Sequence, residues 1–509
     1  MMMFLNFLLA LLPIIWLIVA MMVFKMTTWK AALGSALVAA AEALLIWKTP
    51  ANVVMLSALE GICMALWPIV LVIIAAVYTY NLVCRTGGMD VIKQMLCSVS
   101  TDKRVLVLLV AWCFGGFMEG MAGFGTAIAI PAGMLTAMGF KPLFSCLLCL
   151  VANSVPTAWG SIGIPTITAS NLVGFDNAIG LSVMETIQAV PFMIAIPIIL
   201  VMITGKGIKG MKGMWTITLA SGISFVIPMF IVSFFLGAEL VMVVASVCSL
   251  IVTALLAKRV KPDPAYAMET KKTTTTLKEA AVAAAPFLLI FVFLLGTSKL
   301  IRPVYDFLAQ FSTTVYFVNE TSGTTFSWIN TPGVWIFLCA ILGGLIQKAS
   351  FQDFKEVFLA TLKQMSGSVY VMLSVLACAK IMIYSGMISD SSAFAIAVTG
   401  SFYPFFAPWL GALGTFVTGS GTSSGVLFGQ VQMEAAEALH MDPHWMVALN
   451  MIGVGAGKMI SPQSLAIALS AVDRPGEDSS LMKKAMPYAA VFLLVMSVIG
   501  LVGAWIIHS

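Results

Sequence analysis

The chain has 509 residues, of which 60% are hydrophobic and 10% charged, with a mean hydropathy of +1.03. A soluble globular chain is about 45–50% apolar and about 25% charged, so the composition excludes a soluble enzyme. At about 20 apolar residues per crossing, the length leaves room for roughly a dozen membrane spans. The net charge of +5 comes from basic residues scattered singly through short loops. We therefore expect a lipid bilayer around the protein and no nucleic-acid partner.

The apolar runs, taken in chain order, predict the spans. Residues 1–24 have no basic residue ahead of the run and no small-residue cleavage site, so we expect a retained first span and not a signal peptide. Further apolar runs lie at about 31–47, 58–83, 104–118, 143–159, 187–204, 213–236, 239–257, 281–300, 332–347, 366–384, 402–417, 443–460 and 486–507.

Basic residues orient these spans. They gather in the loops 25–30, 85–104, 205–212 and 258–279. Cytoplasmic loops are enriched in Lys and Arg, so we place these four loops in the cytoplasm and the N-terminus outside. The Ser/Thr-rich segment 302–331 is then an external loop.

The chain also resembles itself at a spacing of about 300 residues. For example, Thr86-Gly87 recurs as Ser385-Gly386. Loops in equivalent positions differ in charge, since 85–104 is basic and 386–401 has no Lys or Arg. This places equivalent loops on opposite sides of the membrane, which is the inverted-topology repeat of secondary transporters. We expect an N-terminal repeat at 1–257, a cytoplasmic linker at 258–280 and a C-terminal repeat at 281–509.

Four segments are too rich in Gly, Ser, Thr and Pro to form straight spanning helices. They lie at 115–125, 153–165, 418–425 and 453–464. Unwound backbone within a membrane is tolerated only where it lines a cavity or is buried in protein. Close packing of small residues between helices is the alternative explanation for each cluster.

These four segments define the expected architecture. The segments 104–140 and 403–441 predict re-entrant hairpins, entering from the cytoplasm and from outside respectively. The segments 143–165 and 443–464 predict spanning helices broken near mid-membrane. The predicted fold class is therefore an all-α polytopic membrane protein with inverted repeats, two hairpins and two broken helices.

The broken segments also carry the candidate site. Their helix ends offer free N–H groups and a positive dipole end to a small anion. Glu119, the only acidic residue in the four segments, is the candidate for carrying a coupling proton, because burial allows a carboxyl to bind and release one. A structural, hydrogen-bonded Glu119 is the alternative. Lys458 could neutralise a carboxylate substrate, or it could pair with Glu119 or a backbone carbonyl.

Polar residues of these segments complete the expected substrate site. They are Asn153, Ser154, Thr418, Ser420, Thr422, Ser423, Ser424, Lys458, Ser461 and Gln463. The glycines expected to form the hairpin tips are Gly120, Gly123, Gly125 and Gly419. Two further ionisable residues lie in apolar runs: we expect Glu60 to be solvated and Lys380 to extend its ammonium toward the outer surface.

The sequence contains no pattern that indicates a metal site or an enzyme active site. The nine cysteines lie in or beside apolar stretches, and Cys146 and Cys149 have no second pair or nearby His. The three histidines, His440, His444 and His508, have no ligand cluster around them. We expect no metal and no cofactor. Because we find no nucleophile–base set or nucleotide loop, we expect that the protein is not an enzyme.

At the broken segments the sequence resembles the lactate permease family. The matching stretches run over nearly the whole chain; they are FGGFMEGMAGFG (114–125), GFKPL (139–143), NSVPTAWGSIGIP (153–165), TGSGTSS (418–424) and GKMISPQS (457–464). One departure concerns the second tip, which in the family typically reads T-G-S-D-T-S-S-N. Here Gly421 and Gly425 replace the Asp and the Asn.

The resemblance implies a proton-coupled symporter for L-lactate, D-lactate or glycolate in the cytoplasmic membrane of a prokaryote. It also implies a homodimer that works by an elevator-like motion. If the family Asp carries the proton elsewhere, Gly421 cannot, and either the role falls more heavily on Glu119 or the coupling differs. A Na⁺-coupled carboxylate transporter of the same architecture is the alternative, because the Ser/Thr-rich tip offers oxygen ligands. A passive channel is disfavoured by the broken helices.

Overall fold

The structure is a computed structural model that describes the chain except for residues 1, 124, 261–262, 269–274, 320–322 and 509. In this part of the chain, nine helices are long and apolar enough to cross a membrane, or up to eleven if each bent pair is one span. The protein is thus a helical, multi-pass membrane protein, as its composition predicts. It departs from an all-α fold at one short hairpin of strands β1 (Ser312–Val315) and β2 (Thr324–Ser327), which pair antiparallel.

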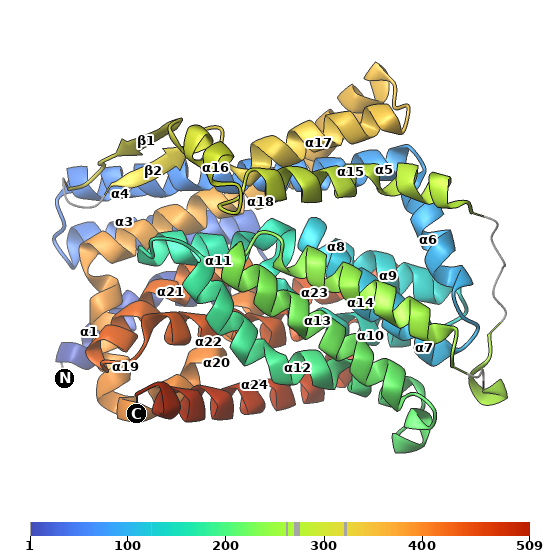
Figure 1. The fold of residues 1–509 in the computed structure, drawn as a ribbon. Coiled ribbons are helices and arrows are strands. Elements are labelled where there is room, and N and C mark those ends of the chain that lie inside the picture. The colour runs from blue at the N-terminus through green and yellow to red at the C-terminus, as the bar shows by residue number, and fades with distance from the viewer. Residues whose placement is uncertain (1, 124, 261–262, 269–274, 320–322, 509) are drawn as a thin grey trace.

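The helices lie roughly along one direction (Figure 1). In the first half of the chain they are α1 (Met2–Ala10), α2 (Leu12–Met22), α3 (Thr28–Leu45), α4 (Ala51–Met64), η1 (Ala65–Val70), α5 (Leu71–Arg85), α6 (Gly88–Ser98), α7 (Lys103–Val107), η2 (Leu108–Phe114), α8 (Gly115–Met121), α9 (Thr126–Ala137), α10 (Pro142–Ala152), η3 (Pro156–Trp159), α11 (Gly160–Val173), α12 (Ile179–Thr204), η4 (Ile208–Met211), α13 (Trp215–Phe235) and α14 (Val241–Ala257).

The second half contains η5 (Pro264–Tyr266), α15 (Leu277–Gly296), α16 (Arg302–Ala309), α17 (Pro332–Ile346), α18 (Phe351–Ser385), α19 (Met387–Thr399), η6 (Gly400–Phe402), α20 (Tyr403–Thr418), α21 (Gly421–Ala438), α22 (Pro443–Ile460), α23 (Pro462–Ser470) and α24 (Asp478–His508).

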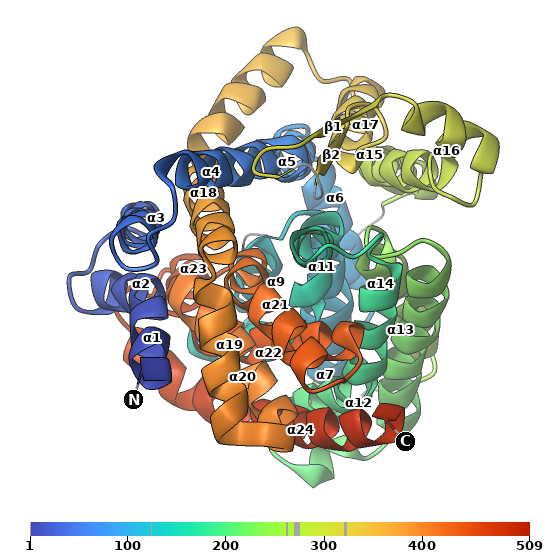
Figure 2. The same ribbon diagram turned by 90° about the vertical axis from the view of Figure 1, so that its left-hand side faces the viewer.

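One group of helices, which we call the scaffold helices, covers one flank of the molecule. It consists of α3, α4, η1, α5, α15, α17 and α18, which pack against one another. The group contains two long helical segments of 35 residues each: α4, η1 and α5 together form residues 51–85, and α18 forms residues 351–385. Viewed from the left of Figure 1, α3, α4, α5, α15 and α17 form an arc, and α18 descends from it beside α19–α21 (Figure 2).

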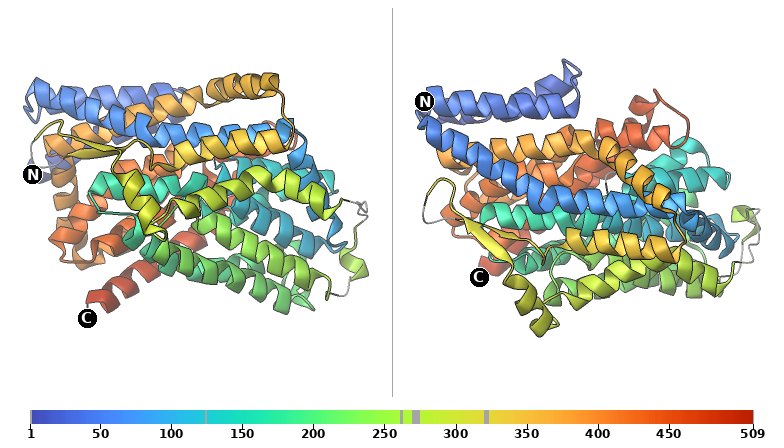
Figure 3. Two further views of the ribbon diagram at one scale, coloured as in Figure 1. Left: turned by 45° about the horizontal axis from the view of Figure 1, so that its top comes forward. Right: turned by 90° about the horizontal axis from the view of Figure 1, so that it is seen from above.

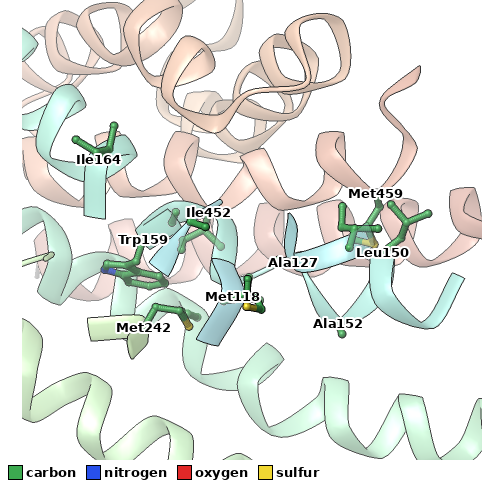
Figure 4. Packing of buried hydrophobic residues seen from close by; sticks show 14 of the residues in the cluster. Met118, Ala127, Leu150, Ala152, Trp159, Ile164, Met242, Ile452 and Met459 are labelled. Atoms are coloured by element: carbon green, nitrogen blue, oxygen red, sulfur yellow. The ribbon is translucent and has the colours of Figure 1, made fainter. Parts of the chain in front are cut away.

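A second group, the core helices, lies beneath the scaffold helices and consists of α8–α11 and α20–α23. Residues far apart in the chain meet here, since α11 packs on α21 and α22 packs on η3. The apolar side chains between them are fully buried; they include Met118, Ala127, Trp159, Ile452 and Met459 (Figure 4). Helices α12, α13, α14 and α24 close the opposite flank (Figure 3).

The order of helices in residues 28–204 recurs in residues 332–508. The correspondence pairs α3 with α17, α4–α5 with α18, α6 with α19, α7–α8 with α20, α9 with α21, α10 with α22, α11 with α23 and α12 with α24. Helices α13 and α14 have no counterpart in this order. Whether the two halves are inverted in a membrane stays a prediction.

The breaks in the core helices are shorter than the sequence predicts. The first helix runs on to Met121, and α9, which begins at Thr126 after Gly125 with a φ of +86°, packs against α8. The second turn is confined to Gly419 and Ser420, where Gly419 has a φ of +69° between α20 and α21. Between α10 and α11 the axis bends by 68°, and Ser161, Ile162 and Gly163 adopt positive φ.

The expected unwinding at residues 453–457 is wrong. Helix α22 is continuous through its glycines, and the chain is interrupted only at Ser461. A Cβ on Gly455 would overlap the carbonyl oxygen of Ser154, and one on Gly457 would overlap that of Ala412. These glycines therefore allow the backbones of neighbouring helices to touch, which is the small-residue packing described above as the alternative.

The expectations for Glu60 and Lys380 are also wrong. The side chains of these residues are buried, and Lys380 Nζ lies 2.8 Å from Glu60 Oε1. Glu60 Oε1 also accepts a hydrogen bond from Thr324 in β2. The pair therefore joins α4 to α18 inside the scaffold, where two buried charges compensate each other.

Candidate functional site

A cavity of about 310 Å³, the Glu119 cavity, lies between the core helices and the scaffold helices. Its core wall is formed by the turns at both hairpin ends, by the start of α11 and by the junction of α22 and α23. Its scaffold wall comes from the start of α3 and the middle of α18, at residues 27–29 and 364–372. Glu119 and Lys458 are the only charged residues among the described residues that line it.

These two charged side chains form a buried ion pair. Lys458 Nζ lies 2.6 Å from Glu119 Oε1, and the side chains are 7% and 3% exposed. Asn153 donates a hydrogen bond of 3.0 Å from Nδ2 to Glu119 Oε2. The absence of a side chain at Gly160 makes room for the carboxyl group, because a Cβ there would come within 2.6 Å of Glu119 Oε1. Both carboxyl oxygens of Glu119 are thus held by donors.

Besides α11, whose first turn is distorted by positive φ values, four helices begin at the cavity. For α3, α9 and α21 the capping residue lines it, and for α23 the second and third residues do. Helix N-termini carry unsatisfied N–H groups and a partial positive charge, so each of these ends favours an anion. The cavity thus combines one ammonium group with several backbone donors around a space wide enough for a small carboxylate.

The structure brings most of the sequence-predicted residues to this cavity. Those that line it are Glu119, Lys458, Thr418, Ser420, Thr422 and Gln463, together with Gly125 and Gly419. Gly421, where the resemblance described above places an Asp, also lines the cavity as the first residue of α21. The cavity therefore lacks the carboxyl group that an Asp at this position would supply.

Other predicted residues lie behind the lining and support it. Ser154 Oγ donates to the carbonyl of Val151, and Ser424 Oγ donates to that of Gly411. Ser423 donates its backbone N–H to Ser420 Oγ at the second turn. Gly120 packs on α14, and Gly123 lies against Ser161. The remaining one, Ser461, is buried as the capping residue of α23.

Sequence reasoning missed the scaffold wall. Thr27, Thr28, Gln364 and Ser368 are polar residues in or next to apolar helices, and no sequence pattern singled them out. Thr157, Ser161 and Ser464 also line the cavity; they lie inside segments that the sequence marked as broken, but were not named as site residues.

Behind the cavity, a second acidic residue supports the bend between η3 and α11. Glu185 in α12 is fully buried, and its Oε2 lies 2.7 Å from Thr166 Oγ1. The same Thr166 hydroxyl lies 2.9 Å from the carbonyl oxygen of Ala158. In the described part of the chain there is no group of three or more His, Cys, Asp or Glu residues that could hold a metal ion.

Comparison with known proteins identifies the family. The model of the L-lactate permease family matches residues 6–507. An L-lactate permease of Streptococcus iniae is 41% identical over 445 residues, covering 86% of this chain and 93% of that protein. An L-lactate permease of Escherichia coli strain K12 is 34% identical, and the glycolate permease GlcA of the same strain is 32% identical; each comparison covers 99% of this chain and 96% of the relative. The chain therefore belongs to the L-lactate permease family.

Proposed function

We propose that the protein transports lactate, or a related 2-hydroxy monocarboxylate such as glycolate, across the cytoplasmic membrane together with a proton. Relatives named as L-lactate and glycolate permeases support the substrate class. The observation that carries the proposal is the Glu119–Lys458 pair in a cavity otherwise lined by neutral groups and helix N-termini. Such a site suits one small carboxylate.

The pair suggests how substrate and proton are coupled. A carboxylate that enters the cavity competes with Glu119 for the ammonium of Lys458. Breaking a buried ion pair leaves an uncompensated charge, which is strongly unfavourable. If Glu119 takes up a proton as the substrate carboxylate replaces it, no uncompensated charge remains. The released carboxyl group still has Asn153 within hydrogen-bonding distance.

This exchange keeps the site electrically neutral. The empty site holds one ammonium and one carboxylate, and the loaded site holds one ammonium, one substrate carboxylate and a neutral Glu119. A neutral site is the form that costs least to move through a membrane interior. The proposal therefore includes one proton per substrate and no net charge transferred in either half of the cycle.

The hydroxyl groups of the lining support selection of 2-hydroxy acids. Thr422, Gln463 and Ser464 line the same cavity as Lys458, and their side chains can hydrogen-bond both to a carboxylate and to a hydroxyl on the neighbouring carbon. An analogue without that hydroxyl would leave some of these groups unpaired, which lowers its affinity.

The orientation and assembly belong to the same proposal. We place the N-terminus outside, because loops rich in Lys and Arg favour the cytoplasm. A homodimer moving by an elevator-like mechanism is implied by the family resemblance, with the scaffold helices as the static part and the core helices as the moving part.

Uptake by reconstituted vesicles tests the proposal. Lactate should accumulate under an inward proton gradient, and an imposed membrane potential alone should not drive it. Glycolate should compete, and a dicarboxylate should not. Accumulation that requires a Na⁺ gradient at fixed pH would replace the proton with Na⁺, and the absence of saturable uptake of any of these acids would refute transport itself.

A further inference from the structure

A second cavity lies between the two groups of helices. Its volume is about 370 Å³, and we call it the Thr331 cavity. Its scaffold wall comes from η1, from the end of β2 and the start of α17, and from the C-terminal end of α15. Its facing wall is formed by residues 167–179 and 236–240. None of the residues that line it line the Glu119 cavity.

The scaffold walls of the two cavities come from equivalent parts of the repeat. Residues 27–29 and 364–372 form the scaffold wall of the Glu119 cavity. Shifting these ranges by the repeat spacing of about 300 residues leads to the regions around 327–329 and 64–72. The Thr331 cavity is lined by Ser327 and Asn330 from the first region and by Trp67 and Pro68 from the second. The two cavities are therefore related by the repeat.

Each cavity also receives the N-terminus of one scaffold helix. Thr27 caps α3 at the Glu119 cavity, and Thr331 caps α17 at the Thr331 cavity. In neither case does the threonine side chain accept a hydrogen bond from its own helix. The N–H groups of Thr28 and Trp29 in α3 and of Gly333 in α17 make no backbone hydrogen bond among the described residues, and together with the threonine hydroxyls they can bind another partner.

The Thr331 cavity has two unpaired donors. Thr331 is 3% exposed, and its Oγ1 makes no hydrogen bond to any described residue. The indole Nε1 of Trp335, one turn further along α17, is buried and unpaired in the same sense. Both residues line the cavity. Because a buried polar group without a partner is costly, two such groups at one helix N-terminus point to an acceptor that binds there in another state.

The facing wall explains why an anion would not bind in the present arrangement. It carries the carboxyl groups of Asp176 and Glu239, and Lys299 of the scaffold wall is the one basic residue among the described lining residues. An anion would therefore meet two acidic groups. The core surface that carries Lys458 faces the Glu119 cavity instead.

We infer that the Thr331 cavity is the scaffold half of a second site for the substrate carboxylate. This second site is completed when the core helices move. Lys458 and the turns at 419–422 and 462–464 then face the Thr331 cavity in place of the wall that carries Asp176 and Glu239. In that state Thr331, Trp335 and the N-terminus of α17 take the place of Thr27 and the N-terminus of α3. The inference rests on the proposed transport function.

Sided transport kinetics test the inference. Thr331→Val should raise the KM for lactate presented from the side of the 302–331 loop by about tenfold, because a hydrogen bond to a charged group is lost, and should leave the KM from the other side unchanged. Thr27→Val, the matched variant, should show the reverse. Measurements in right-side-out and inside-out vesicles separate the two. Equal changes on both sides, or none from Thr331→Val, in vesicles that still transport lactate would overturn the inference.

Crosslinking gives a second, independent measurement. Asn330→Cys and Gln463→Cys, combined in a cysteine-depleted background, place one cysteine in each cavity. Mercury should bridge these two cysteines only during transport. The bridge should then stop transport until a thiol is added. Gln364→Cys with Thr422→Cys, which line one cavity, should be bridged at rest. Failure to bridge the first pair while the second pair reacts would overturn the inference. If the parent shows no carboxylate uptake at all, the proposed function itself fails instead.

Discussion

Replacing Glu119 with Gln tests whether substrate and carboxyl group compete for Lys458. The variant keeps the size of the side chain and a group that can hydrogen-bond, but it removes the anion that holds the ammonium at 2.6 Å. Removing one partner of a buried pair typically costs about 3–5 kcal/mol. Because this pair borders a cavity, we take the lower end, about 3 kcal/mol. When lactate binds to the wild type, the cost of breaking the pair reduces the binding free energy by this amount. Glu119→Gln has no pair to break, so it should bind lactate roughly a hundredfold more tightly.

The pH dependence should change as well. If substrate binding is accompanied by uptake of one proton, the Kd of the wild type should weaken about tenfold for each unit of rising pH in the range where Glu119 is ionised in the empty protein. The Kd of Glu119→Gln should not depend on pH, and the variant should retain exchange of lactate but lose proton-driven accumulation. Equilibrium binding of labelled lactate between about pH 6 and about pH 8 measures both effects.

A matched control is present in the same chain. Glu60 and Lys380 form another buried Glu–Lys pair, at 2.8 Å, that does not line the Glu119 cavity. Glu60→Gln should leave both the Kd and its pH slope as in the wild type. If Glu119→Gln is well folded and has the same Kd and the same slope as the wild type, the competition mechanism is refuted.

Three other outcomes are expected. Propionate, which lacks the 2-hydroxyl, should compete with lactate uptake at least about tenfold more weakly, and equal competition would show that the hydroxyl is not recognised. Gly455→Ala should lower the free energy of unfolding by about 1–3 kcal/mol, because its Cβ would overlap the carbonyl of Ser154, whereas Gly296→Ala, with open space around it, should not; thermal unfolding in detergent compares them. A cysteine at Thr313 should react with an impermeant reagent in intact cells and one at Ala265 should not, and the reverse result would exclude the proposed orientation.

The general fold could be predicted because its signals are compositional and periodic. Apolar runs gave the spans, and most of the Gly/Ser/Thr/Pro clusters marked true interruptions, such as the turn at Gly419 and the bend at Ser161. The cluster around Gly455 shows the limit, because glycines that unwind a helix and glycines that let helices touch have the same composition. Only the positions of the neighbouring backbones decide between these two outcomes.

Only the core wall of the Glu119 cavity could be predicted from the sequence. Glu119 and Lys458 stood out because charges are rare in apolar runs, and their pairing was among the open alternatives. The error on Glu60 and Lys380 has the same origin, since partners 320 residues apart in the sequence cannot be matched without the fold. The scaffold wall could not be predicted for another reason: Gln364 and Ser368 are ordinary polar residues in the first half of a long helix, and only the fold shows that they face the cavity.

The Thr166 hydroxyl has a consequence for spectroscopy. It carries one hydrogen but lies within hydrogen-bonding distance of both the Ala158 carbonyl and Glu185 Oε2. If that hydrogen is given to Ala158, the short contact with Glu185 requires a hydrogen from the carboxyl group, so Glu185 is an un-ionised acid. Infrared spectra should then contain a carboxylic acid C=O band that is indifferent to lactate and disappears in Glu185→Gln. A second band of this kind, appearing only when lactate is added, would belong to Glu119.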